Sequence, residues 1–176
     1  MPEPESTPSQ HIAAALLGAQ RVVVLTGLML GRPDDEDLTS ARSAWAQQAS
    51  LEVLLTDPAS FWRFCHPAAQ AIAQRPITAA HRALVRLQQA GIIGHLITQS
   101  VDHRQTIAGA HDVIEVHGNI LTARCTRCGE RYGLAEISEL LSAAADGVPR
   151  CTAAECAYPL RPSSTLWGEP LIEDAV

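Results

Sequence analysis

Four cysteines in the second half of the chain have the spacing of a metal site. Cys125 and Cys128 are separated by two residues, and Cys151 and Cys156 follow with four residues between them. A Cys-x-x-Cys turn brings two thiolates to neighbouring corners of a tetrahedron, about 2.3 Å from a zinc ion. Four thiolates fill that coordination shell and leave no position for a catalytic water. The spacing therefore predicts one structural zinc ion held by these four residues.

Two other interpretations of the cysteines stay open from the sequence. They could be unrelated buried thiols, or Cys125 and Cys128 could form a redox pair. The fifth cysteine, Cys65, lies in the aromatic segment FWRFCHP, and we expect it in the core rather than as a reactive thiol. An odd number of cysteines argues against a complete set of disulfides and favours a reducing compartment.

Polar residues follow three segments that have the pattern of buried strands. Apolar runs at residues 21–25, 92–98 and 113–116 are followed by Thr26-Gly27, by Gln99 and by His117. Ligands of parallel α/β sheets bind beyond the carboxyl ends of the strands. The residues after the first two runs are therefore expected to lie at a ligand site. An isolated histidine such as His117 could equally be satisfied by a backbone carbonyl.

Helices are expected between these strands. Helical patterns cover residues 11–20, 39–55, a segment from residue 58 that carries Phe61 and Trp62, 76–90 and 134–145. Residues 31–37 form a polar, acidic loop. Alternating strands and helices predict an α/β fold with a parallel sheet, into which a small cysteine module is inserted.

Composition limits the classes of function. The chain has 176 residues, 47% of them hydrophobic, and a formal net charge of -6. This length supports one core, and the acidic balance gives no attraction for nucleic acid or an anionic membrane. Just two arginines, Arg124 and Arg127, flank the first cysteine pair, which argues against a zinc ribbon for nucleic acid. Without a long apolar run or a basic N-terminal segment, we expect a cytoplasmic protein.

Several short motifs together resemble a protein family. The chain carries, in order, a strand entering Thr26-Gly27, residues 76–84 (PITAAHRAL), 98–102 (TQSVD), Ala108-Gly109, 113–118 (VIEVHG), the two cysteine pairs, Arg161-Pro162 and 167–170 (WGEP). In this order and spacing the chain resembles a sirtuin. The resemblance implies an NAD-binding, Rossmann-like part over residues 11–120, a zinc-binding module over 121–160 and a return to the first part over 161–176, with residues 1–10 as a flexible tail.

The resemblance also implies an activity and its residues. Sirtuins transfer the acyl group of an acylated lysine to the ADP-ribose of NAD and release nicotinamide. His117 would be the general base that acts on the ribose hydroxyls, a role suited to an imidazole. Thr26 and Gly27 would contact the cofactor, and Gln99 and Asp102 would lie at the ribose and nicotinamide. The acyl-lysine peptide would lie over a stretch that begins at Trp167 and Gly168.

The first cofactor loop departs from the family pattern. Leu28, Met29 and Leu30 stand where sirtuins have small residues that let the backbone approach the pyrophosphate. Residues 31–34 (GRPD) resemble a remnant of a later family stretch, and the carboxylates of residues 34–37 oppose a bound pyrophosphate. Ser100 replaces an expected asparagine, and residues 103–105 (HRQ) replace Gly-Leu-His.

The chain also stops at Val176, where sirtuins continue with further strands and helices. We therefore expect an incomplete parallel sheet with an unpaired apolar edge, which a partner chain could complete. Together with the altered loop, this predicts a sirtuin-type NAD-dependent protein deacetylase or deacylase whose activity is impaired in the isolated chain. The alternative is a non-catalytic, zinc-stabilised interaction module or a decayed gene product.

Overall fold

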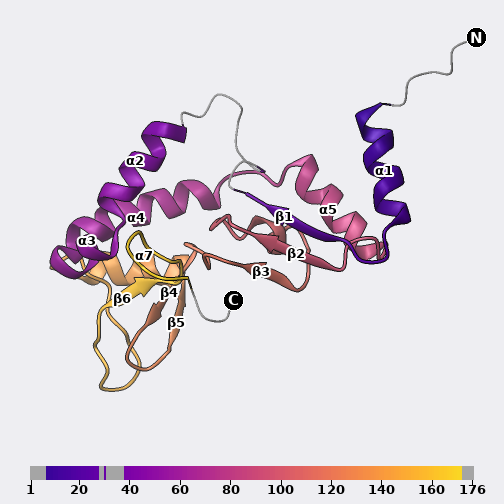
Figure 1. Ribbon diagram of the computed structural model, residues 1–176. Coiled ribbons are helices and arrows are strands. Elements are labelled where there is room, and N and C mark those ends of the chain that lie inside the picture. The colour runs from indigo at the N-terminus through magenta and orange to yellow at the C-terminus, as the bar shows by residue number, and fades with distance from the viewer. Residues whose placement is uncertain (1–6, 28–29, 31–37, 172–176) are drawn as a thin grey trace, which may run out of the picture.

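The computed structural model describes residues 7–27, 30 and 38–171. Its described part contains two sheets of three strands each. The first consists of β1 (Val23–Thr26), β2 (His95–Thr98) and β3 (Val113–Glu115), and the second of β4 (Thr122–Cys125), β5 (Arg131–Gly133) and β6 (Leu160–Pro162). The helices are α1 (Pro8–Gly18), α2 (Leu38–Gln48), α3 (Leu51–Thr56), α4 (Pro58–Ala73), α5 (Ala79–Gln89), α6 (Arg104–Ile107) and α7 (Leu134–Ala143), as Figure 1 shows.

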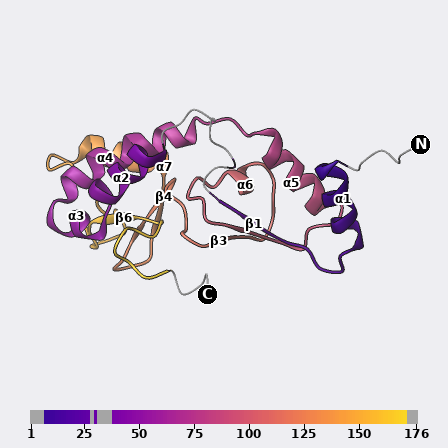
Figure 2. The ribbon, with the colours of Figure 1, turned by 45° about the horizontal axis from the view of Figure 1, so that its top comes forward.

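The first sheet is parallel, with the order β1-β2-β3, as the α/β fold class predicts. Val24, Leu96 and Val113 are paired across it, so their side chains share one face. Leu96 and Val113 pack with Val85 of α5 in one apolar cluster. Helix α5 lies along this side of the sheet (Figures 1 and 2), with α6 beside it in Figure 2.

The opposite face of the parallel sheet is apolar and exposed. Val23, Leu25 and Ile114 keep 56%, 65% and 40% of their surface accessible to solvent. Within the described part of the chain, no helix covers this face in either view (Figures 1 and 2). A soluble sheet normally buries at least one such apolar face against another layer, so this surface is unusual.

The second sheet is antiparallel, with the order β5-β4-β6, and it packs against helices rather than extending the first sheet. Phe61, Trp62 and Cys65 of α4 are buried in one cluster with residues of the cysteine module, namely Ala123, Cys125, Tyr132, Ile137, Cys151 and Leu160. The expectation that the aromatic helix faces the core, with Cys65 inside it, is confirmed.

Several predicted elements differ from the structure in their bounds. The helix expected from residue 11 begins at Pro8 with Thr7 as its N-cap, so residues 8–10 lie in α1 and not in the expected tail. The single helix expected over residues 39–55 is two helices, because Ser50 starts α3 by accepting a hydrogen bond from the Val53 N–H (3.3 Å). The strand expected from residue 92 begins at His95. The N–H groups of Ile92 and Ile93 instead donate to the Leu87 carbonyl (3.0 and 3.3 Å) and close the end of α5.

The predicted domain boundaries are not tested by these elements and stay predictions. Leu28, Met29 and residues 31–37, on which the expectations for the altered loop depend, lie outside the described residues. Among the helices that the structure describes, none is both long and apolar enough to cross a membrane.

Candidate metal centre and cavity

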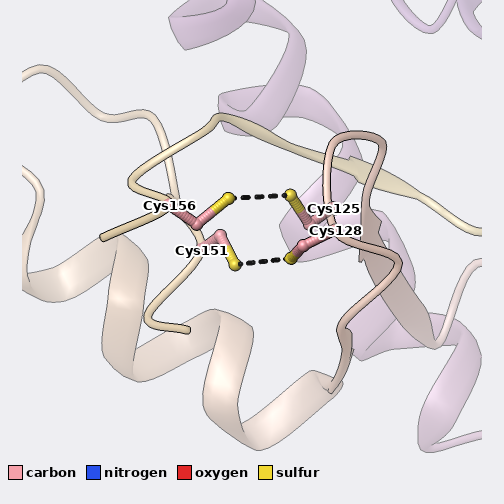
Figure 3. A group of neighbouring side chains, drawn as sticks. All are labelled: Cys125, Cys128, Cys151 and Cys156. Atoms are coloured by element: carbon pink, nitrogen blue, oxygen red, sulfur yellow. Dashed lines mark hydrogen bonds between the residues drawn. The ribbon is translucent and has the colours of Figure 1, made fainter. Parts of the chain in front are cut away.

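The four cysteines predicted as metal ligands converge on one point. Their Sγ atoms all lie within 4.8 Å of one another, and they face each other in Figure 3. Cys125 Sγ is 3.6 Å from Cys156 Sγ, and Cys128 Sγ is 3.4 Å from Cys151 Sγ. A tetrahedron with zinc–sulfur bonds of about 2.3 Å has edges of about 3.8 Å, close to these separations, whereas a disulfide needs about 2.05 Å. The cluster therefore fits a structural zinc site and rules out four unrelated thiols.

The first cysteine pair sits on a tight turn that prepares it for a metal. The Cys125 N–H donates to the Glu130 carbonyl (2.8 Å) and the Gly129 N–H donates to the Cys125 carbonyl (2.9 Å). Gly129 has φ +81°, a conformation that glycine adopts without strain. Burial raises the pKa of the Cys125 thiol, but backbone N–H groups of Cys128 and Arg127 outweigh it and lower the pKa to about 7. These donors favour the Cys125 thiolate that zinc requires. For Cys128 the Glu130 N–H lowers the pKa, but hydrogen bonds with the neighbouring thiols and burial outweigh it and raise the pKa to about 12.

A tyrosine that sequence reasoning missed supports the second pair. The buried Tyr132 hydroxyl donates to Cys151 Sγ (3.1 Å) and accepts a hydrogen bond from the Thr152 N–H (2.8 Å). Such outer contacts orient metal ligands. The sequence contained one indication of this role: Tyr132 lies four residues after Cys128 in a small module, so its side chain must lie close to the metal ligands.

A cavity of about 590 Å³ lies between the carboxyl end of the parallel sheet and the two helices α2 and α4. The predicted residues Gln99, Asp102 and His117 line it, together with Trp167 and Gly168. The sequence separates these residues by up to 69 positions, and the fold brings them to one hollow. Its position matches the expectation that a ligand binds beyond the ends of parallel strands.

His117 occupies the turn that follows β3 and is half-buried. Its carbonyl accepts a hydrogen bond from the Thr165 N–H (2.8 Å), which ties this turn to the far wall of the cavity. On the wall formed by the segment after β2, the Asp102 Oδ1 accepts a hydrogen bond from the Arg104 N–H (3.1 Å). The Gln99 N–H donates to the Thr26 carbonyl (2.9 Å). These bonds, two between backbone groups and one to the Asp102 carboxylate, fix the turns that carry the cavity side chains.

Thr26 and Gly27, the other predicted cofactor residues, lie outside the cavity lining. Thr26 is buried, and its Oγ1 donates to the Ile97 carbonyl (3.3 Å) while accepting from Gln105 Nε2 (2.9 Å). The Thr26 hydroxyl therefore holds the ends of β1 and β2 together. Gly27 is exposed, and a Cβ built on it meets no atom of the described residues within 4 Å, so these residues leave space beside its backbone.

Three residues that differ from the sirtuin pattern, Ser100, His103 and Arg104, form hydrogen bonds within the protein. The Ser100 N–H donates to Thr98 Oγ1 (3.0 Å), and Ser100 lines the cavity. His103 adopts φ +57° and its Nδ1 lies 2.7 Å from the Glu115 Oε1; this hydrogen bond raises the pKa of His103. The guanidinium of buried Arg104 donates to the Ile72 carbonyl.

The other end of the cavity is apolar, and sequence reasoning did not assign it to a site. Trp45, Ala49, Cys65, Ile72 and Leu166 line this region. Burial raises the pKa of Cys65 to about 12, which keeps it a neutral thiol and agrees with its predicted core role. The aromatic pattern of α4 gave a core signal, but it contained no sign that the same helix also borders a cavity.

Comparisons with known proteins give one family. The Sir2 family model matches residues 34–176. An NAD-dependent protein deacetylase of Sulfolobus acidocaldarius is 29% identical over 168 residues, covering 93% of this chain and 65% of the relative. An NAD-dependent protein deacetylase of Caldivirga maquilingensis is 32% identical over 170 residues, covering 92% and 63%.

A solved structure of Sir2 with a p53 peptide and NAD+ superposes with a TM-score of 0.80 at 28% identity, covering 96% of this chain and 68% of that one. The chain thus spans about two thirds of the length of the proteins it matches. The family match covers well over half of the chain, and the parallel sheet with its cysteine module has the same fold as the solved relative. This chain belongs to the Sir2 family.

Proposed function

We propose that this protein is an NAD-dependent protein-lysine deacetylase or deacylase. One observation carries the proposal: His117, Gln99 and Asp102 line the same cavity as Trp167 and Gly168, at the carboxyl end of a parallel sheet. A site that must hold a cofactor and a peptide together needs such a hollow between two walls. The names of the Sir2 relatives support the same reaction class.

In the proposed reaction His117 acts as the general base. NAD supplies, when bound, the ribose hydroxyl that accepts the acyl group. His117 lines the cavity from a turn fixed at its backbone, which supports a role in which its imidazole would take a proton from a hydroxyl held there. Gln99 and Asp102, which follow the neighbouring strand β2 at the same edge of the sheet, would orient the ribose and nicotinamide by hydrogen bonds.

The residues near the cavity fit a dinucleotide that extends over the sheet edge. Gln99 and Thr26 are joined through their backbones, so the open space beside Gly27 lies along the same edge as the cavity. Thr26 would act on the cofactor through its backbone, because its hydroxyl is bonded on both sides within the protein. The apolar end of the cavity would receive the acyl chain.

The experiment is a deacylation assay with an acetyl-lysine peptide and NAD, comparing wild type with His117→Ala. Loss of the general base should lower kcat by about 100-fold or more, with little change in the NAD Kd. His111→Ala is a matched control, because His111 is exposed and lies outside the cavity lining. Equal activity of wild type and His117→Ala would refute the assigned role.

We also propose that a second polypeptide completes the three-stranded parallel sheet, as expected from the sequence, and also covers its exposed face. Val23, Leu25 and Ile114 form an apolar surface that a partner layer would bury. Size-exclusion chromatography with light scattering tests this, and Leu25→Lys should dissociate the complex without unfolding the chain. A wild-type protein that is monomeric and binds no partner on co-purification would contradict it. We further propose a cytoplasmic location, which is supported by the five cysteines, none of which is in a disulfide in the described residues.

A further inference from the structure

The far wall of the cavity is a segment without regular structure. Residues 164–168, which we call the wall segment, follow β6 and include Trp167 and Gly168. Their backbone shape cannot come from a helix or from a ladder of strand bonds. Something else must fix the wall segment if it is to receive a peptide in one orientation.

One ion pair bridges the wall segment from end to end. Arg161 lies in β6 just before it, and Glu169 lies just after it. The guanidinium binds the carboxylate through both nitrogens, with Arg161 Nη2 2.6 Å from Glu169 Oε2 and Nη1 bonded to Oε1. Both side chains are only 13% exposed. A bidentate, largely buried pair of this kind has one geometry, unlike a surface pair.

The same two side chains hold the backbone between them. Arg161 Nη2 also donates to the Ser164 carbonyl (3.2 Å), and Glu169 Oε2 accepts from the Leu166 N–H (2.8 Å). Burial raises the pKa of Glu169, but the bonds from Arg161 and the Leu166 N–H outweigh it and lower the pKa, so the carboxylate stays charged at neutral pH. The pair thus fixes both halves of the wall segment.

The wall segment is in turn bonded to both sides of the cavity. The Thr165 N–H donates to the His117 carbonyl (2.8 Å), and the Leu51 N–H donates to the Trp167 carbonyl (2.9 Å). A shift of the wall segment would therefore move the peptide wall relative to the His117 turn. The expected cofactor residues Gln99 and Asp102 follow β2, whereas these two bonds of the wall segment go to the His117 turn and to Leu51.

We propose that Arg161 and Glu169 are positioning residues for the acyl-lysine peptide, which hold the wall segment in its peptide-receiving conformation. This inference rests on the proposed function. It predicts a selective effect: weakening the ion pair impairs peptide binding and leaves NAD binding largely intact, because the expected contacts of Gln99 and Asp102 with NAD follow β2 and lie outside the wall segment.

Glu169→Gln tests this with the least disturbance, since glutamine keeps the size and an acceptor for the Leu166 N–H. The zinc-loaded protein is titrated with a fluorescent acetyl-lysine peptide at saturating NAD, and separately with NAD alone. The peptide Kd should rise roughly tenfold, and the NAD Kd should change less than about twofold. Glu169→Asp, which keeps the charge, should recover part of the peptide affinity. Arg150→Gln is the matched control, because its ion pair with Asp146 (2.9 Å) is exposed and outside the cavity lining.

Each outcome decides a different claim. An unchanged peptide Kd in Glu169→Gln, or equal losses of peptide and NAD binding with a lower Tm, would overturn the positioning role while the proposed function stands. Wild-type protein that binds NAD but no acetyl-lysine peptide would refute the proposed function, and the positioning role with it.

Discussion

Removing one metal ligand should destabilise the chain by an amount set by zinc affinity. Cys128 is the exposed member of the cluster, so Cys128→Ala removes a thiolate with little loss of buried surface. Outer contacts to metal ligands are worth about 10–100-fold in affinity, so a direct ligand should be worth at least about 100-fold. When the free zinc concentration exceeds the zinc Kd of both wild type and Cys128→Ala, a 100-fold weaker affinity lowers the free energy of unfolding by about 2.7 kcal/mol. For a chain of this size the Tm should fall by about 5–11 °C.

The effect should reach the cavity, because Cys125, Cys151 and Leu166 belong to the same buried cluster as α4. Calorimetry in buffered zinc, with zinc content measured by mass spectrometry, gives the shift and the stoichiometry. In excess chelator, wild type and Cys128→Ala should melt at the same temperature. A wild-type Tm that chelator does not change, or a mutant deficit that persists in chelator, would refute the metal argument.

Three further predictions follow from single contacts. Leu96→Ala should cost about 2–5 kcal/mol in urea unfolding and Leu25→Ala less than about 1, because Leu96 is 0% and Leu25 65% exposed; equal costs would contradict the described sheet face. Since Glu115 raises the pKa of His103, the pair's stability is fully present below pH 6.5 and is lost as the pH rises through the folded pKa. Glu115→Gln should abolish that part of the pH dependence, measured by urea unfolding at pH 6 and 8, and an unchanged slope would exclude the pair. With a pKa of about 12, Cys65 should resist alkylation by iodoacetamide at pH 8 in the folded, zinc-loaded protein. Mass spectrometry detects the alkylated product, and rapid alkylation would count against the burial of Cys65.

Features that depend on residues close together in the chain could be predicted from the sequence. The cysteine spacing predicted a cluster that the structure brings within one ligand sphere. Thr78 and Asp57, at the starts of α5 and α4, cap their helices with side-chain oxygens, as such residues do before a helical pattern. These signals depend on neighbours in the chain, so sequence alone contains them.

The features that were missed depend on contacts between distant segments. The break between α2 and α3 coincides with a bridge between Ser50 and Trp167, and no local pattern announces that pairing. The apolar end of the cavity mixes residues of α2 and α4 with Leu166, whose meeting is decided by packing. Likewise the Arg161–Glu169 pair reads in the sequence as two ordinary charges, because its burial comes from the surrounding fold.

Calorimetric titration of NAD into the zinc-loaded protein tests the central claim most directly. The account predicts saturable binding, retained by His117→Ala and weakened by Gln99→Ala, because the Gln99 side chain lines the cavity at the expected cofactor position. Absence of binding heat from a folded sample with one zinc per chain would contradict an NAD-dependent activity of this chain.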